Sequence, residues 1–305
     1  MRANNNIFIL DELKTHSKYF LSIKQNENLS KNTISQYANV LAILYEFCIE
    51  YFDDERDTLA SINKKAIYDF LEYKRWGASS KSTYLTIVKN FLHFVDEESG
   101  NQYNFKSLLR KIKIKTPSKI PKHLTTDEVQ KLITYITTKL FTSKSLLDKK
   151  RGLILYVLIY SGMRVSEILH IKLDSMQLQN DLYAITIIGK GSKERYAYIP
   201  SAPIQATIQK LKDSGYTYLA EGHKGKSTNR FNIYKLTKRV YTKLLIHKTG
   251  VHILRHTLAT TLVSQGTNLS TIKEVLGHSN ISTTMIYARS NEENKKKAVV
   301  GAYEY

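Results

Sequence analysis

The stretch that decides the fold lies near the end of the printed sequence: VHILRHTLAT at residues 251–260, LGHSN at 276–280 and STTMIYAR at 282–289. Apolar spacing predicts a helix from Val251 onward, on which His252 and Arg255 are three residues apart and share one face. A short helix follows and stops at a glycine, with His278 just beyond it. A further helix carries Tyr287. Chemically active side chains are therefore expected close together in a helical domain.

Two more polar residues upstream belong to the same set. Arg164 lies in SGMRVSEIL (161–169), where Gly162 allows a turn, so Arg164 is expected at or near a helix start. Lys190 lies in GKGSK, between the strand-like stretches 183–188 and 195–199. Alternating apolar residues around a glycine-rich loop predict a hairpin with Lys190 at its turn.

The first hundred residues predict a small helical bundle. Their apolar residues recur with helical spacing, with polar caps between the segments. The four expected helices span about 10–21, 34–48 after a cap at Ser30, 61–71 opened by Ser61 and stopping near Gly77, and 80–95. Short polar turns between four helices are typical of a bundle, which gives an N-terminal domain of residues 1–105.

A basic connector is expected at 106–122, KSLLRKIKIKTPSKIPK, which has seven basic residues and no acidic one. Pro117 and Pro121 remove backbone donors, so the segment is not expected to be helical. It either follows a DNA duplex or is a solvated linker. A second domain, 123–305, opens with TTDEV, where Thr125 or Thr126 caps a helix.

The composition bounds the partners and the compartment. Lys and Arg number 46 against 27 Asp and Glu, a net charge of +19, which indicates a polyanion such as nucleic acid, although a general bias toward Lys gives the same excess. The one Cys excludes an intrachain disulfide. The longest apolar run, 153–160, is too short for a membrane span, and 1–14 does not resemble a signal peptide. These features predict a soluble cytoplasmic protein without a membrane partner.

The arginines and the lysine suit phosphodiester chemistry without a metal. Guanidinium groups remain protonated and bind phosphate oxygens in pairs, so Arg164 and Arg255 can hold one phosphate from two segments. A structural ion pair of Arg164 with Glu167 is the alternative. Lys190, flanked by glycines, can approach a ligand and donate a proton to a leaving oxygen, or is a solubilising charge only.

A tyrosine and two histidines would supply the nucleophile and the proton transfers for this phosphodiester chemistry. Tyr287 is one of 21 tyrosines, and two nearby Arg cations would favour its phenolate, which can attack phosphorus and keep the bond energy in a phosphotyrosyl link. His252 and His278 can exchange protons with the phosphate or bind it by hydrogen bonds. His256 is expected on another side of the helix, as a buried packing or hydrogen-bonding residue.

A zinc site is the competing interpretation of HILRH. His252 and His256 have the i, i+4 spacing of two zinc ligands, and His278 is a conceivable third. The zinc hydrolase pattern HExxH needs a glutamate at the second position, which is Ile253 here. No metal, nucleotide or other cofactor is therefore expected.

Taken together, SGMRVSEIL, IIGKGSKERYAYIP, HILRHTLATTLVSQG and LGHSNISTTMIYA resemble the catalytic boxes of the tyrosine site-specific recombinases of the phage-integrase family, most of all the Xer type. The resemblance covers nearly all of 124–290. Residues 31–48, KNTISQYANVLAILYEFC, are similar to the core-binding domain of that family. The implied fold is mainly α, a helical core-binding domain followed by a helical catalytic domain with a small β-hairpin or sheet.

The resemblance also implies a role for each matching residue. Arg164 and Arg255 would bind the phosphate, Lys190 would be the general acid and His252 a general acid and base. His278 would donate a hydrogen bond to the phosphate, and Tyr287 would be the nucleophile. Glu167 would support the first arginine. The implied reaction cleaves and rejoins double-stranded DNA without metal or ATP.

Family architecture implies a clamp around DNA, a homotetramer on two near-palindromic sites, and two sequential strand exchanges through a Holliday junction. The tail after Tyr287 would dock on a neighbouring protomer. Xer-type members resolve chromosome dimers under a septal DNA translocase, and integration of a phage or mobile element is the rival role. Two other classes remain open from the residues, an architectural DNA-binding protein and a type IB topoisomerase.

Overall fold

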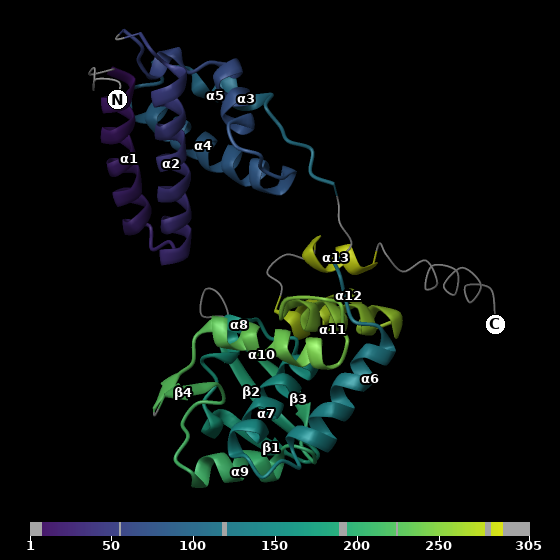
Figure 1. Ribbon diagram of the computed structural model, residues 1–305. Helices are drawn as coiled ribbons and strands as arrows, with labels where there is room; N and C mark the ends of the chain where they lie inside the picture. Colours follow the sequence, from purple (N-terminus) through teal and green to yellow (C-terminus); the bar gives the residue numbers. More distant parts are fainter. Residues whose placement is uncertain are drawn as a thin grey trace, which may run out of the picture. The chain divides into compact units, whose positions relative to one another are not determined.

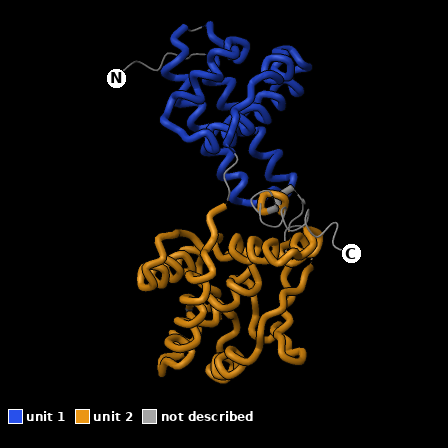
Figure 2. Tube along the Cα trace, turned by 90° about the vertical axis from the view of Figure 1, so that its right-hand side faces the viewer, with its two compact units in different colours: residues 1–118 blue, residues 119–305 orange. Residues whose placement is uncertain are grey.

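The computed structural model describes residues 8–54, 56–117, 121–188, 194–223, 225–277 and 282–288. Most of these residues are helical, with two small antiparallel sheets, so the predicted mainly α class is confirmed. The chain divides into two compact units, Met1–Ser118 and Lys119–Tyr305 (Figure 2). No helix in the described ranges is both long and apolar enough to cross a membrane.

The first unit is a helical bundle with its own apolar core. Its elements are α1 (Phe8–Asn26), α2 (Lys31–Tyr51), η1 (Leu59–Ser61), α3 (Lys64–Glu72), α4 (Ala78–Glu98) and α5 (Phe105–Arg110) (Figure 1). The expected cap of α2 is confirmed, because the side-chain oxygen of Ser30 accepts the N–H of Thr33 at 3.2 Å. Phe20, Leu44 and Phe91 are fully buried where the helices meet.

The predicted start and stop of the third helix were wrong. Ser61 closes the short η1 turn, and the side chain of Asn63 caps α3 instead. The helix ends at Glu72, and Gly77 is the N-cap of α4 rather than a stop for α3. A second polar residue two positions after Ser61 therefore decides where the helix begins.

The expectation that the connector is non-helical from residue 106 was also wrong for its first part. Phe105 and Leu109 are both buried on one face of α5, and Ile112 follows them into the core of the first unit. The buried carboxylate of Asp96 accepts the N–H groups of Tyr103 and Asn104, which fixes the chain just before the helix. Apolar residues three and four apart thus outweigh the basic composition, and the first unit extends past the expected boundary at 105.

The second unit combines helices with a three-stranded sheet (Figure 1). Its elements are α6 (Thr126–Tyr135), the π-helical turn η2 (Ile136–Leu140), α7 (Leu146–Ser161), α8 (Val165–Ile168), η3 (Leu173–Ser175), β1 (Met176–Gln179), β2 (Leu182–Ile188), β3 (Glu194–Pro200), α9 (Gln205–Asp213), β4 (Glu221–His223), β5 (Lys226–Ser227), α10 (Arg230–Lys243), α11 (His252–Ser264), α12 (Leu269–Leu276) and α13 (Ser282–Ala288). Of the two predicted caps, Thr125 or Thr126, it is Thr125 that caps α6, in a capping box with Glu128.

The predicted hairpin is present as β2 and β3. The strands pair antiparallel, with Leu182 opposite Pro200 and Ile188 opposite Glu194. Ile185 and Ile199 are fully buried in the core of the second unit, where β3 packs against the apolar helix α7. The turn at 189–193 lies outside the described residues. The sequence did not predict β1, which adds a third strand beside β2.

Three helices near the C-terminal end pack on one another. α13 contacts α11 and α12, and α11 also packs along α7 (Figure 1). Between α11, α12 and α13 lies a small apolar cluster of Ala259, Val263, Ile272, Leu276 and Tyr287. This cluster fixes α13 on the second unit.

Gly162 is required where α7 ends. Its φ is +58°, and its N–H donates to the carbonyl of Leu158. A Cβ at this position would lie 2.9 Å from side-chain carbons of both Leu258 and Leu276. The close approach of α11 and α12 to the end of α7 therefore leaves no room for a side chain.

Replacing Gly162 by alanine should lower the free energy of unfolding by about 2 to 4 kcal/mol, since left-handed strain and overpacking act together. Chemical denaturation measures the change. Gly215→Ala is the matched control, because its φ is +78° and a Cβ there meets nothing within 4 Å. The control should lose only about 1 kcal/mol, and equal losses in the two variants would contradict the overpacking.

Candidate active site

Arg164 stands at the N-cap of α8, directly after the turn that ends α7. Its backbone N–H donates to Glu167 Oε2 and its Nη1 donates to Glu167 Oε1, both at 2.8 Å. Its Nη2 donates to the carbonyl of Gly277 at 3.3 Å. The position at a helix start was predicted, and the ion pair with Glu167 given as the alternative is present as well.

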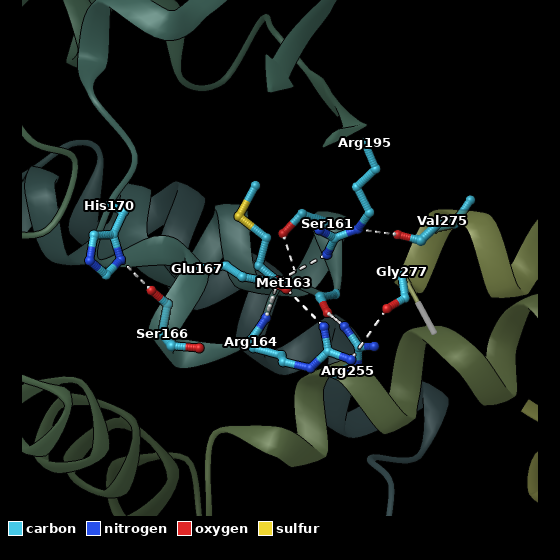
Figure 3. Close-up of polar contacts among 11 residues, drawn as sticks. Ser161, Met163, Arg164, Ser166, Glu167, His170, Arg195, Arg255, Val275 and Gly277 are labelled. Carbon is cyan, nitrogen blue, oxygen red and sulfur yellow. Dashed lines mark hydrogen bonds and ion pairs between the residues drawn. The ribbon is translucent and has the colours of Figure 1, made fainter. Parts of the chain in front are cut away.

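Glu167 is the carboxylate at the centre of the site (Figure 3). Its side chain is only 6% exposed, and besides Arg164 it accepts a hydrogen bond from Nη2 of Arg195 at 2.9 Å. Burial raises the pKa of Glu167, but the N–H of Arg164 and the two guanidinium groups outweigh burial and leave the pKa lowered. The carboxylate is therefore charged at neutral pH.

Arg255 on α11 lies beside Arg164 (Figure 3). It is 5% exposed, and its Nη1 donates to the carbonyl of Gly162 at 2.8 Å. Burial, followed by the charge of Arg164, lowers the pKa of Arg255 to about 10, so the group remains a cation at neutral pH. Its buried Nη2 has no acceptor within the described part of the chain. The two predicted arginines are thus brought together from distant segments.

Sequence reasoning missed Arg195, which connects three parts of the site from β3. Besides the bond to Glu167, its Nε donates to the carbonyl of Val275 at 3.3 Å. A Cβ at Gly277 would lie 2.7 Å from that Nε, so the end of α12 lies directly against the guanidinium. The available signal was an arginine next to the alternating residues of the strand, but the direction of its side chain depends on how β3 packs.

His252 and His256 lie on α11 on either side of Arg255. His252 is exposed, and partial burial, then the charges of Arg255 and Arg164, lower its pKa. The prediction that His256 lies on another side of the helix was wrong, because residues four apart share a face. The prediction that it is a packing or hydrogen-bonding residue is confirmed by its contact with Tyr287. Nδ1 of His256 is 2.5 Å from the hydroxyl oxygen of Tyr287. The i, i+4 spacing of the two histidines could have indicated this.

Tyr287 is 4% exposed and packs in the apolar cluster of α11, α12 and α13. Burial raises the pKa of its phenol, and the charge of Arg255 only partly opposes that effect. The expected effect of a nearby cation is present for Arg255, but burial outweighs it and the phenolate is not favoured overall. The phenol is protonated at neutral pH, so its proton has to be removed before it can attack.

Two predicted site residues, Lys190 and His278, lie outside the described residues. The strands before and after the turn of Lys190 are in place, and Gly277 ends α12 immediately before His278. Among the described residues, no group of three His, Cys, Asp or Glu side chains is arranged to bind a metal.

Comparison with known proteins identifies the family. Residues 122–294 match the model of the phage integrase family. The chain belongs to this family. The tyrosine recombinase XerD of Listeria innocua serovar 6a is 31% identical over 290 residues, covering 88% of this chain and 91% of that protein. Other similar proteins are tyrosine recombinases of the names XerH, XerC and XerA.

Solved structures extend the likeness over both units of this tyrosine recombinase. XerH bound to a palindromic difH substrate, after cleavage, superposes with a TM-score of 0.75 at 24% identity, over 92% of this chain and 83% of that chain. A lambda integrase tetramer bound to a Holliday junction superposes with a TM-score of 0.64 at 14% identity, over 88% of this chain and 77% of that chain. The likeness is one of fold, a helical core-binding domain and a catalytic domain. The chain is an enzyme of the kind that cleaves and rejoins DNA.

Replacing Glu167 by glutamine should destabilise the protein by about 2 to 4 kcal/mol at pH 7, because buried guanidinium groups lose their counter-charge. The folded-state pKa is depressed below 4.5, so the stabilisation is present above that value and is lost as the pH falls through the folded pKa. Denaturation of both proteins from pH 7 to pH 3 measures the difference.

Glu46→Gln is the control, because Glu46 is 56% exposed in its ion pair with Lys74. Its loss should be below about 1 kcal/mol at every pH. If the difference in unfolding free energy between wild type and Glu167→Gln does not shrink in acid, packing rather than charge stabilises this site.

Proposed function

We propose that this enzyme is a site-specific recombinase in which Tyr287 attacks a DNA phosphodiester and forms a 3′-phosphotyrosyl link. The observation that carries the proposal is the pairing of Arg164 and Arg255, with Tyr287 near enough that it and Arg255 shift each other's pKa. A phosphate oxygen is the acceptor that the buried Nη2 of Arg255 would take.

The charge balance of the site favours an anionic partner. Arg164, Arg195 and Arg255 are three cations around one carboxylate, Glu167. Placing like charges together costs free energy, which a bound phosphate would offset. In the transition state the phosphorus carries more negative charge than in the substrate, so fixed guanidinium groups stabilise it further.

The remaining roles follow the family resemblance. Tyr287 forms a bond to phosphorus while the bond to the 5′ oxygen breaks, and Lys190 donates the proton that this oxygen needs. His252, exposed beside Arg255, acts as general acid and base at the phosphate, and His278 donates a hydrogen bond to it. A second DNA hydroxyl then reverses the step on a new partner, so neither ATP nor a metal is consumed.

The assembly is proposed to be a homotetramer on two DNA sites, with two sequential strand exchanges through a Holliday junction. The XerH and lambda integrase structures support this, since one holds a palindromic DNA site and the other is a tetramer on such a junction. The N-terminal unit, predicted over 1–105, and the basic residues of 106–122 would bind the duplex. With that basic segment included, residues 1–122 carry 19 basic and 14 acidic side chains, a net charge of +5.

The tail after Tyr287 is proposed to dock on a neighbouring protomer and to couple the subunits. Its sequence includes the apolar stretch AVVGAY at 298–303. A cavity of about 140 Å³ between α6, α7 and α11 offers a receiving surface, lined mainly by apolar side chains such as Val129, Ile133 and Leu258. Burying aliphatic residues there would contribute to association.

The biological role is proposed to be resolution of chromosome dimers in the cytoplasm, at a short near-palindromic site during chromosome segregation and cell division. A septal DNA translocase would be the controlling partner. The Xer names of the similar proteins support this role. Integration of a phage or mobile element is the alternative within the same chemistry.

Tyr287→Phe should abolish covalent attachment to a nicked suicide duplex, because the attacking oxygen is removed. Wild-type protein should form the adduct equally well in EDTA, and Tyr183→Phe, a buried tyrosine of β2, should still form it. Denaturing gel electrophoresis of labelled DNA measures the adduct. An adduct that persists in Tyr287→Phe would move the nucleophile to another residue, such as Tyr303 or Tyr305.

Mapping where the protein becomes covalently attached on its own genomic DNA should yield one short near-palindromic sequence on the chromosome. Attachment at the ends of a mobile element would support integration instead. Relaxation of supercoiled plasmids without a preferred site would indicate a type IB topoisomerase. Salt-dependent binding without any adduct would indicate an architectural protein.

A further inference from the structure

The hydroxyl of Tyr287 already has a partner that no role in the proposed reaction uses. His256 lies one helical turn after His252 on α11, and its Nδ1 is 2.5 Å from the hydroxyl oxygen of Tyr287. The two ring centroids are 5.8 Å apart with the planes inclined at 45°, so the imidazole meets the edge of the phenol that bears the oxygen. The rest of the phenol ring is packed in the apolar cluster.

The protonation states of the pair decide which atom donates. Burial raises the pKa of Tyr287, so the phenol keeps its proton. Burial, then electrostatic interaction with His252, Arg255 and His123, lowers the pKa of His256, so the imidazole is neutral at pH 7. These three groups come from α11 itself and from the segment before α6. A neutral phenol beside a neutral imidazole donates its O–H to the unprotonated nitrogen, here Nδ1.

We propose that His256, rather than His252, is the base that removes the proton of Tyr287 during cleavage, an assignment that rests on the proposed function. The phenol O–H bond breaks and the proton moves to Nδ1, giving an imidazolium. The oxygen of Tyr287 bonds to phosphorus as the 5′ oxygen leaves with a proton from Lys190. On rejoining, Lys190 accepts the proton of the attacking 5′ hydroxyl and His256 returns its own proton to the phenol.

Helix α11 fixes the proposed base close to the group that binds the phosphate. His256 follows Arg255 directly, so the base and one phosphate-binding group are fixed relative to each other by the backbone of α11. Arg255 is anchored to the carbonyl of Gly162 and the phenol is anchored in the apolar cluster. The three groups that must meet at one phosphate are therefore attached to the same packed helices.

His256→Asn is the sharpest test, because the asparagine side chain can still accept a hydrogen bond near the position of Nδ1 but cannot take up a proton. The substrate is a nicked duplex that carries the mapped site, with either oxygen or sulfur bridging the scissile phosphate on its 5′ side. Sulfur leaves without being protonated, so a variant that lacks Lys190 should regain cleavage on the sulfur substrate. A variant that lacks His256 should not, because its defect is in the attacking phenol and not in the leaving group.

Single-turnover cleavage by His256→Asn should be about 100-fold slower than wild type at pH 7 on both substrates, the usual loss when a general base is removed. Its rate should rise roughly tenfold per pH unit above pH 7, as hydroxide replaces the missing base, while the wild-type rate is flat there. His247→Asn, an exposed histidine outside the site, should match wild type in rate and pH profile. Gel mobility shift should show unchanged DNA binding in both variants.

Three outcomes separate the possibilities. Cleavage by His256→Asn within about threefold of wild type, with the same pH profile, would reduce His256 to a packing residue. Faster cleavage would mean that the hydrogen bond restrains the phenol. Either result overturns the assignment and leaves Tyr287 as nucleophile, whereas failure of wild-type protein to form any adduct would refute the proposed function itself.

A measurement on the unmodified protein covers the case in which the variant does not fold. Nitrogen NMR distinguishes a protonated from an unprotonated imidazole nitrogen. The free wild-type protein should show the proton of His256 on Nε2 and none on Nδ1 at pH 7. A proton on Nδ1 would mean that the imidazole donates to the phenol oxygen, which would overturn the assignment.

Discussion

A single buried carboxylate, that of Glu167, holds the cationic side chains of the catalytic site together. Glu167 accepts hydrogen bonds from the backbone of Arg164, from its guanidinium and from Arg195. The site gathers cations before any DNA is present, and cations this close repel one another in a medium of low dielectric constant. The carboxylate compensates part of that repulsion inside the protein. It also ties together the turn before α8, the strand β3 and, through the two arginines, the end of α12.

Backbone carbonyls at helix ends supply the rest of the compensation. Arg255 donates to Gly162 at the C-terminal end of α7, and Arg164 donates to Gly277 at the C-terminal end of α12. Helix C-termini carry partial negative charge, so both contacts are electrostatically favourable. Each arginine is bound by an element other than its own. The two guanidinium groups therefore keep their relative position only while α7, α8, α11 and α12 keep their packing.

Structural features that depend on residues close together in the chain could be predicted from the sequence. Features that depend on how the elements pack could not. The caps at Ser30 and Thr125 and the hairpin of β2 and β3 follow from local patterns. Arg164 and Arg255 could be singled out because phosphate chemistry needs guanidinium groups. Arg195 could not, since its role depends on which face of β3 meets α12. The basic composition around α5 concealed its apolar face.

The chemistry of Tyr287 illustrates the same limit. Its nearness to a cation was expected, but how deeply it is buried was not visible in the sequence, and burial is what determines its proton affinity. His256 was predicted as a packing or hydrogen-bonding residue, but its partner could not be named because it lies on α13, 31 positions further along the chain. Spacing on one helix identifies neighbours, whereas contacts between helices identify partners.

The glycine at the end of α12 also bears on how this chain can evolve. Gly277 is approached from two sides, by Arg164 at its carbonyl and by Arg195 where a Cβ would stand. One added or deleted residue in α12 would turn its end by about 100° about the helix axis and move both contacts out of register. The distance along the chain between Arg255 and Gly277 is therefore not free to change. Descendants of this protein should remain constant in length between these two residues.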